Sequence, residues 1–126
     1  LSLVHPFEED LGFLYGTIIV GEAQDPAHHS RNVCVFADGE VDRCPTGTGV
    51  SARAAIHFAR GELRRDQHFV VESSLGTTFT GMVVEEVQFG PYKAVVPQVT
   101  GSAHISGRAE WLIDPDDPLW QGFVLR

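Results

Sequence analysis

The chain has 126 residues, of which 43% are hydrophobic, and this composition is typical of one compact domain rather than a disordered segment. Seventeen acidic residues against nine basic ones give a formal charge of −8, which argues against a nucleic-acid partner. No apolar run approaches the roughly 20 residues that span a bilayer, so we expect no membrane partner. Two cysteines, Cys34 and Cys44, are too few for a disulfide scaffold. They indicate reduced thiols in a cytoplasmic protein, and they leave a single bridge open.

The N-terminal third of the chain predicts two strands joined by a polar loop. Leu11 to Val20 is a dense run of β-branched and aromatic residues, which is typical of a buried strand. Gly21 to Ser30 has the Gly, Asp, Pro and His content of a loop, and Asn32 to Ala37 is the second strand. Asp38-Gly39 predicts a tight turn directly after it. Alternation along the second strand gives one face to Asn32, Cys34 and Phe36.

The segment from Asp42 to Leu63, DRCPTGTGVSARAAIHFARGEL, predicts a helix. Pro45 and several small or hydroxylated residues lead into about four helical turns. Gly61 follows the last apolar residue, where a left-handed C-terminal cap is expected. Small residues in the helix include Gly49, Ala52, Ala54, Ala55 and Ala59. Because small side chains let other backbones approach closely, we expect this helix to lie inside a sheet.

The remainder of the chain predicts β structure almost throughout. The candidate strands, separated by Gly or Pro, are Phe69 to Ser73, Thr77 to Gln88, Tyr92 to Val99, Gly101 to Ile105 and Glu110 to Ile113. Asp114 to Arg126 is expected to begin as a turn and to end as a short strand. The predicted fold class is therefore α+β, with one central helix wrapped by many short strands.

The loop from Asp42 to Gly49 has the chemistry of an amino-acid site. The N-terminus of a helix presents unpaired backbone N–H groups and the positive end of a dipole, which suits a small carboxylate. Gly47 and Thr48 present such amides with little obstruction, and Asp42 is able to accept hydrogen bonds from a cationic amine. Two plainer interpretations stay open on this pattern: Thr46 as a simple helix cap, and Asp42 as a turn or ion-pair residue.

The string DRCPTGTGVSARAA at 42–55 resembles the second-half active-site motif of the proline racemase family. Racemases and epimerases of this family carry Asp-Arg-Ser-Pro-Cys-Gly-Thr-Gly there. The likeness continues through FLYGT (13–17), SRNVCVFADGEVDR (30–43), ESSLGTTFTG (72–81), VVPQVTGSAHISG (95–107) and IDPDDPLWQGFVLR (113–126). The resemblance therefore covers essentially the whole chain. It implies a diaminopimelate epimerase-like fold, in which a bent mixed sheet wraps the central helix.

The resemblance also implies roles for five residues of this chain. The helix-capping catalytic position of the family falls on Thr46, and the backbone amides that hold the substrate carboxylate fall on Gly47 and Thr48. The acidic residue that contacts the substrate amine falls on Asp42. A pocket-lining aromatic residue falls on Phe36. Together these residues form the predicted substrate site.

Thr46 departs from the racemase motif, which has a cysteine at this position. Inversion of an α-carbon uses two bases, and a helix N-terminus tunes a thiol toward the thiolate, whereas a threonine hydroxyl is not a base near neutral pH. Elimination needs one base if the β-carbon carries a leaving group. The resemblance thus implies a trans-3-hydroxy-L-proline dehydratase, a cofactor-independent lyase that forms Δ1-pyrroline-2-carboxylate, with Thr46 orienting the ring or the leaving hydroxyl. A proline racemase or hydroxyproline 2-epimerase variant is the alternative.

Cys44 stands where the family usually has serine. Because Cys44 lies two residues before Thr46 with Pro45 between them, its sulfur is expected to lie off the helix start. We therefore interpret it as a small buried residue rather than a replacement base. The six histidines show no HxxxH or HxH spacing, so no metal site is predicted.

Family members have two similar halves, and the first half carries its own cysteine in a Met-Cys-Gly-His motif. This string does not occur here, and the chain begins at Leu1 rather than at Met. We expect residues 1–126 to be the C-terminal domain, with its tail, of a two-domain protein whose N-terminal half is missing. Alone, the chain is expected to be inactive. A non-enzymatic fragment that at most binds a proline-like small molecule is the alternative from another class, and homodimer formation is left open.

Overall fold

The computed structural model describes residues 3–124, and its centre is a five-stranded mixed sheet with a single α-helix in that range. The strands follow the chain order across the sheet: β1 (Gly16–Gly21), β2 (Ser30–Phe36), β3 (Phe69–Ser73), β4 (Thr78–Phe89) and β5 (Tyr92–Thr100). β2 and β3 are parallel, and the other neighbouring pairs are antiparallel. Two short 3-10 helices, η1 (Glu9–Leu11) and η2 (Ala37–Gly39), precede β1 and follow β2. The predicted α+β class is confirmed.

Helix α1 (Gly47–Ala59) is the crossover between the parallel strands β2 and β3. Parallel neighbours need such a connection because a tight turn cannot join them. After α1, Gly61 has φ +73°, and the amides of Gly61 and Glu62 donate to the carbonyls of Phe58 and His57 at 3.0 and 2.9 Å. The predicted left-handed cap is therefore confirmed. No helix within residues 3–124 has the length and apolar character needed to cross a membrane.

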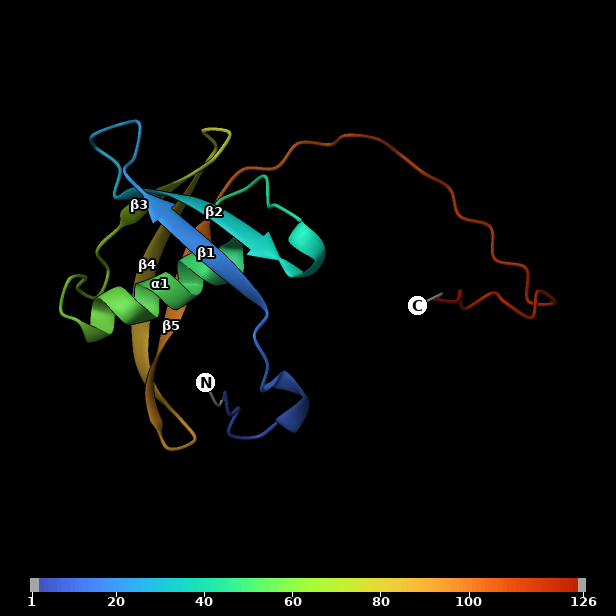
Figure 1. Ribbon diagram of the computed structural model, residues 1–126, viewed down its shortest axis with the longest axis horizontal. Helices are drawn as coiled ribbons and strands as arrows, with labels where there is room; N and C mark the ends of the chain where they lie inside the picture. The colour runs from blue at the N-terminus through green and yellow to red at the C-terminus, as the bar shows by residue number, and fades with distance from the viewer. Residues whose placement is uncertain (1–2, 125–126) are drawn as a thin grey trace.

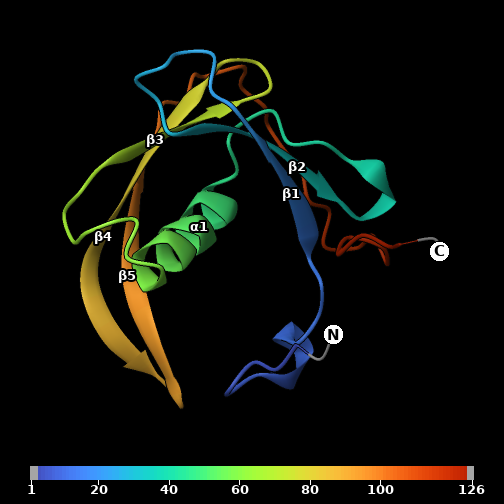
Figure 2. The same cartoon turned by 60° about the vertical axis from the view of Figure 1, so that its left-hand side comes forward.

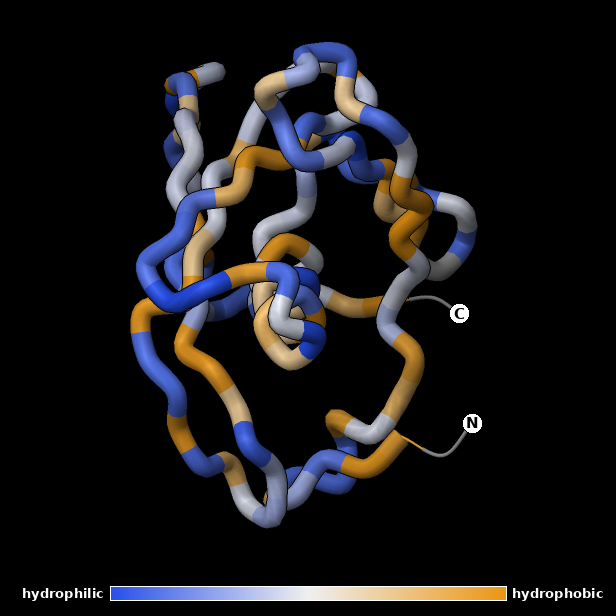
Figure 3. The backbone as a smooth tube through the Cα atoms, turned by 90° about the vertical axis from the view of Figure 1, so that its left-hand side faces the viewer, coloured by the Kyte–Doolittle hydropathy of each residue, from blue (hydrophilic) through white to orange (hydrophobic). Residues whose placement is uncertain are grey.

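The sheet bends around α1. In Figure 2, β1 and β2 pass on one side of the helix and β4 and β5 on the other, and Figure 3 shows the helix end-on with strands around it. Glycines permit this close approach: a Cβ at Gly49 would overlap Ile18 of β1, and one at Gly81 of β4 would overlap Val50 of α1. The sheet thus wraps the small-residue helix as expected, but the helix is only partly buried, since Ala52, Ile56 and Ala59 are exposed.

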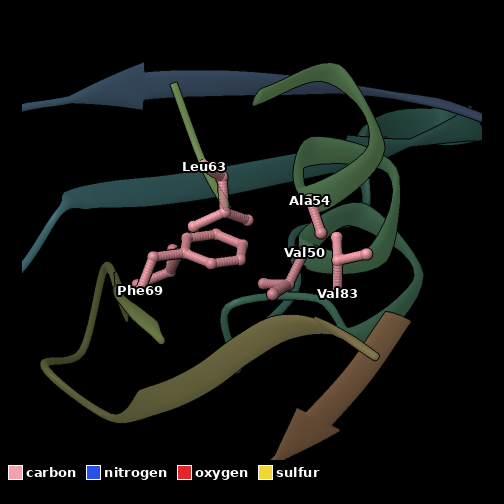
Figure 4. Packing of buried hydrophobic residues seen from close by; sticks show 6 residues of the cluster. Val50, Ala54, Leu63, Phe69 and Val83 are labelled. Carbon is pink, nitrogen blue, oxygen red and sulfur yellow. The ribbon is translucent and has the colours of Figure 1, made fainter. Parts of the chain in front are cut away.

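The hydrophobic core fills the space between α1 and strands β3 and β4 (Figure 4). Its members are Val50, Ala54, Leu63, Phe69, Val71 and Val83. Burying a side chain such as Val or Phe contributes about 1.5–3 kcal/mol. This cluster anchors α1 from the β3–β4 side, and it leaves the N-terminal end of the helix facing β1 and β2.

The first strand is shorter than the sequence predicted. β1 begins at Gly16 rather than Leu11, because its ladder with β2 starts at the pair Gly16 and Phe36, where β2 ends. Leu11 instead closes the 3-10 helix η1. Strand propensity alone does not extend a strand past its partner.

Two predicted strands, Gly101 to Ile105 and Glu110 to Ile113, are wrong. After β5 the chain leaves the sheet and runs away from it as irregular structure (Figure 1), with Trp111 86% exposed. Asp114 does begin a turn, in which its carbonyl accepts from the Asp117 amide at 3.1 Å, but no strand follows up to residue 124. Residues 125–126 of that prediction lie outside the described range. The apolar composition of this segment is strand-like, but no neighbouring strand pairs with it.

Candidate active site

Thr46 stands at the N-cap position of α1, and its backbone is left-handed. Its φ of +68° is rare for a β-branched residue, and the side chain is buried at 4% exposure. The hydroxyl makes no capping hydrogen bond to the helix. It donates instead to Asp42 Oδ2 at 2.8 Å. The interpretation of Thr46 as a simple helix cap is therefore wrong, because its side chain turns toward Asp42.

Asp42 links strand β2 to the loop before α1. Its amide donates to the Cys34 carbonyl at 3.1 Å, and its Oδ1 accepts from the Cys44 amide at 3.4 Å. Burial raises the pKa of the Asp42 carboxyl, but the hydrogen bonds from Thr46 and Cys44 outweigh it and hold the pKa below its ordinary value. No cationic side chain within residues 3–124 forms an ion pair with Asp42. Asp42 is thus an anion held by neutral donors.

The Cys44 thiol belongs to the same hydrogen-bonded loop. Its Sγ donates to Asp42 Oδ1 and accepts from the Thr46 amide, both at 3.3 Å. Burial, and then the hydrogen bond to Asp42 and its charge, raise the pKa of the Cys44 thiol against the opposing bond from the Thr46 amide. Cys44 and Cys34 are both free thiols. A thiol whose pKa is raised stays protonated near neutral pH and does not accept a proton there, which agrees with Cys44 as a structural residue, although it is half-buried rather than buried.

A cavity of about 190 Å³ lies between the N-terminal end of α1 and strands β1 and β2. Its lining residues are Tyr15, Gly16, Ile18, Cys34, Phe36, Thr46, Thr48, Gly49 and Ala52. Three of the five predicted site residues, Phe36, Thr46 and Thr48, therefore meet in one place. Asp42 does not line the cavity. It is linked to the cavity by its hydrogen bond with the Thr46 hydroxyl. Gly47 is also outside the lining, but it belongs to the first helical turn, whose amides have no partner within the helix.

Several lining residues were not predicted as site residues. Cys34 lies on the same inward face of β2 as Phe36. Strand alternation in the sequence had already placed both side chains on one face. Tyr15 packs its ring edge-on to Phe36 with centroids 5.3 Å apart. Tyr15 precedes β1, where no ladder imposes alternation, so the sequence left its face open.

Two of the histidines, His28 and His57, each lie within hydrogen-bond distance of a carboxylate. His28 Nδ1 lies 2.8 Å from Glu72 Oε1, and His57 Nδ1 lies 2.6 Å from Glu62 Oε2. Across residues 3–124, no group of three or more His, Cys, Asp or Glu side chains is arranged to hold a metal ion.

Comparison with known proteins gives the same family throughout. The proline racemase family model matches residues 1–124. The chain is 45% identical over 122 residues to the trans-3-hydroxy-L-proline dehydratase of Colwellia psychrerythraea, with 97% of this chain and 34% of the relative covered. It is 47% identical over 122 residues to the 3-hydroxyproline 2-epimerase of Burkholderia multivorans, covering 97% of this chain and 36% of that one.

A solved structure shares the fold. The crystal structure of a hydroxyproline epimerase from Agrobacterium vitis, with bound trans-4-hydroxy-L-proline, matches 99% of this chain and 35% of its own, with a TM-score of 0.80 and 32% identity. The chain thus spans about a third of the length of the relatives it matches. The match across residues 1–124, the sequence identities and the shared fold together show that this chain belongs to the proline racemase family.

Proposed function

We propose that this chain is the C-terminal domain of a two-domain hydro-lyase, which dehydrates trans-3-hydroxy-L-proline to Δ1-pyrroline-2-carboxylate without a cofactor. The relatives named above support a proline-derived substrate, and the roughly one-third coverage of their length supports a second domain. In this proposal, the other domain supplies the base that removes the α-proton. The isolated chain is then inactive.

The observation that carries the proposal is the Thr46–Asp42 hydrogen bond at the start of α1. Thr46, at the N-terminus of α1, carries a hydroxyl where the family motif has a thiol. The neighbouring Cys44 thiol stays neutral because its pKa is raised. One face of a substrate in the cavity then has no base at this position. Inversion needs a base on each face, whereas elimination needs only one.

The elimination balances with a single base. The base takes the Cα proton, and the electron pair of that bond forms a double bond to the neighbouring ring carbon. The bond from that carbon to its hydroxyl breaks, and the hydroxyl leaves with a proton as water. The resulting enamine then gains a proton at that ring carbon and loses one from its nitrogen, which gives the cyclic imine.

Residues around the cavity match the groups of such a substrate. The first amides of α1, at Gly47 and Thr48, suit the carboxylate because they are unpaired within the helix and lie at its positive end. The anionic Asp42 suits the ring ammonium, with Thr46 between it and the cavity. The rings of Phe36 and Tyr15 offer an apolar wall to the substrate ring. Thr46 Oγ1, whose proton goes to Asp42, is left to accept a hydrogen bond from the substrate.

An epimerase is the second candidate, and one observation favours it. Cys34 lines the cavity together with Thr46, so a thiol is present near the face that lacks the family cysteine. The 47% identical relative named as a 3-hydroxyproline 2-epimerase supports the same alternative. If Cys34 is a base, Cys34→Ser abolishes inversion.

The test uses the intact protein that carries this chain, incubated with trans-3-hydroxy-L-proline in D2O. Borohydride reduction converts an imine product to proline, which is separated from the substrate by mass. The proposal predicts reducible imine and no inverted hydroxyproline. Deuterated hydroxyproline of inverted configuration would show an epimerase instead. Absence of turnover together with absence of binding of any cyclic imino acid would support the non-enzymatic fragment.

A further inference from the structure

The peptide bond between Pro45 and Thr46 is held from both sides. The Pro45 carbonyl accepts from Asn32 Nδ2 at 3.3 Å, and the Thr46 amide donates to Cys44 Sγ at 3.3 Å. A trans peptide is planar, with its C=O and N–H pointing in opposite directions, and residues 3–124 contain no cis peptide. These two hydrogen bonds therefore fix the rotation of the Pro45–Thr46 peptide plane. That rotation sets the positive φ of Thr46.

Asn32 is itself held in one orientation by Arg53. Asn32 is 1% exposed on β2, and its Oδ1 accepts from Arg53 Nη1 at 2.6 Å. A guanidinium can only donate hydrogen bonds, so the amide oxygen of Asn32 must face Arg53. The amide nitrogen is then directed at Pro45.

Arg53 lies in α1 and is buried at 8% exposure. Its Nη2 lies 3.3 Å from both His29 Nδ1 and His57 Nε2. Because Nε2 of His57 accepts there, its Nδ1 carries the proton and donates to Glu62 Oε2 at 2.6 Å. This bond lowers the pKa of the Glu62 carboxyl. No carboxylate in the described part of the chain pairs directly with Arg53. The Glu62 carboxylate therefore balances the charge of Arg53 indirectly, through the hydrogen bonds of His57.

These bonds form one hydrogen-bonded chain from the exposed Glu62 through the half-buried His57 to the buried Arg53 and Asn32, and it ends at the Pro45 carbonyl. A buried cation is costly, and replacing such groups by apolar ones is often neutral for stability. Stability alone therefore does not explain the arrangement. The end of this hydrogen-bonded chain indicates another role, because its last acceptor is the carbonyl of Pro45, which directly precedes the strained residue Thr46.

We propose that Asn32 and Arg53 are positioning residues, which hold the Pro45–Thr46 peptide so that the Thr46 hydroxyl and the first amides of α1 face the substrate. The inference rests on the proposed function of the same site and deepens it. Neither residue lines the cavity, so both act through the loop rather than on the substrate.

Asn32→Asp in the intact protein is the sharpest test. It keeps the shape and the oxygen facing Arg53, but it replaces the donor to Pro45 with a second oxygen. Arg53→Met removes the donor that orients Asn32, and Arg53→Lys keeps a donor as the conservative rescue.

Ser73→Ala is the matched control. Ser73 is fully buried and pairs with Asn32 across the β2–β3 ladder, but its hydroxyl forms its hydrogen bonds with Leu75 and Thr77.

Three experiments are made on each variant: steady-state kinetics, which give kcat and KM for dehydration; thermal unfolding, which gives the melting temperature; and NMR, which gives the amide resonance and hydrogen exchange of Thr46. We expect Asn32→Asp and Arg53→Met to lower kcat by about 10- to 100-fold, as a small misplacement of a site does. The Thr46 resonance should shift and its exchange accelerate. Arg53→Lys should recover part of the loss, and Ser73→Ala should lower the melting temperature with kcat unchanged.

Unchanged kcat and an unchanged Thr46 resonance in Asn32→Asp would overturn the proposal. Loss of kcat that merely follows the melting temperature across all four variants would overturn it as well. If the parent protein has no dehydratase activity, the proposed function fails. The Thr46 resonance and exchange then decide the positioning role by themselves, because they need no turnover.

Discussion

The Thr46 hydroxyl donates a 2.8 Å hydrogen bond to Asp42 Oδ2, so its proton is directed at a carboxylate whose pKa is lowered. The Thr46 oxygen then has only lone pairs to offer the cavity. A neutral hydroxyl oxygen accepts a hydrogen bond from a substrate hydroxyl or ammonium, but it does not remove an α-proton. This geometry fits the proposed lyase, because it leaves residue 46 without a base.

Thr46→Val and Thr46→Ser separate the hydroxyl of Thr46 from its shape. Valine keeps the branch but loses the bond to Asp42, which is expected to cost about 1–2 kcal/mol, or about 5- to 30-fold in kcat/KM. Serine keeps the hydroxyl and relieves the strain of a β-branched residue at φ +68°, so it should retain most of the activity. Steady-state kinetics on trans-3-hydroxy-L-proline compares the two. Equal activity of both variants would mean that the Thr46–Asp42 bond has no part in turnover.

Cys44→Ser should leave turnover unchanged. A serine hydroxyl replaces the thiol as donor to Asp42 and as acceptor from the Thr46 amide, and a neutral thiol contributes no base. The measurement is kcat from pH 6 to pH 9. A loss of about 100-fold or more, the size seen when a general base is removed, would identify Cys44 as the base.

Glu72 is expected to control the acid stability of the fold. Its carboxylate accepts from the amides of Asp25 and Gln24 at 2.9 and 2.8 Å and from His28, and these bonds lower its pKa from 4.5 to about 2. A depressed pKa contributes stability that is complete above the unfolded value of 4.5 and is lost as the pH falls toward about 2.

Glu72→Gln therefore lowers the melting temperature most near neutral pH. The difference in melting temperature between this variant and the unsubstituted protein becomes smaller below pH 4.5. Glu86→Gln, on an exposed position of β4, is the control for the loss of one charge. It should show little change at either pH. A gap for Glu72→Gln that stays constant between pH 7 and pH 3 would contradict the assignment.

Gly49→Ala should destabilise the contact between α1 and β1. The added Cβ would overlap Ile18 and press on Thr46, and overpacking of this kind costs about 1–3 kcal/mol. Ile18→Val removes the Cδ1 atom that the new carbon meets, so the cost of Gly49→Ala should be smaller in that background. Denaturant unfolding of the two single variants and the double variant measures this coupling. Additive effects would mean that Ile18 does not limit the approach of α1.

The sequence predicted the helix, its C-terminal cap and most of the strands, because these follow from local composition and periodicity. It failed for residues 101–113, whose strand-like composition has no partner strand, and for 11–15, where β2 ends before a ladder can continue. Pairing partners are long-range properties that a local pattern does not contain.

Of the five residues predicted for the site, Phe36, Thr46 and Thr48 line one cavity, because strand alternation and a helix start determine their directions. Their roles toward a substrate stay a prediction. The burial of Arg53 was not foreseen, since Arg53 and His57 on one helix face indicate a polar edge. Two of the residues that make this burial tolerable, Asn32 and His29, lie 21 and 24 residues away in sequence.

Incubating the intact protein with L-proline in D2O tests directly whether a base acts from the side of Thr46, because L-proline has no leaving hydroxyl and isolates proton transfer from elimination. Chiral chromatography with mass detection follows both configurations. With no base on the Thr46 face, deuterium enters L-proline with retention or not at all, and no D-proline forms. Accumulation of D-proline carrying deuterium at Cα would show a second working base, which is incompatible with a Thr46 face that has none.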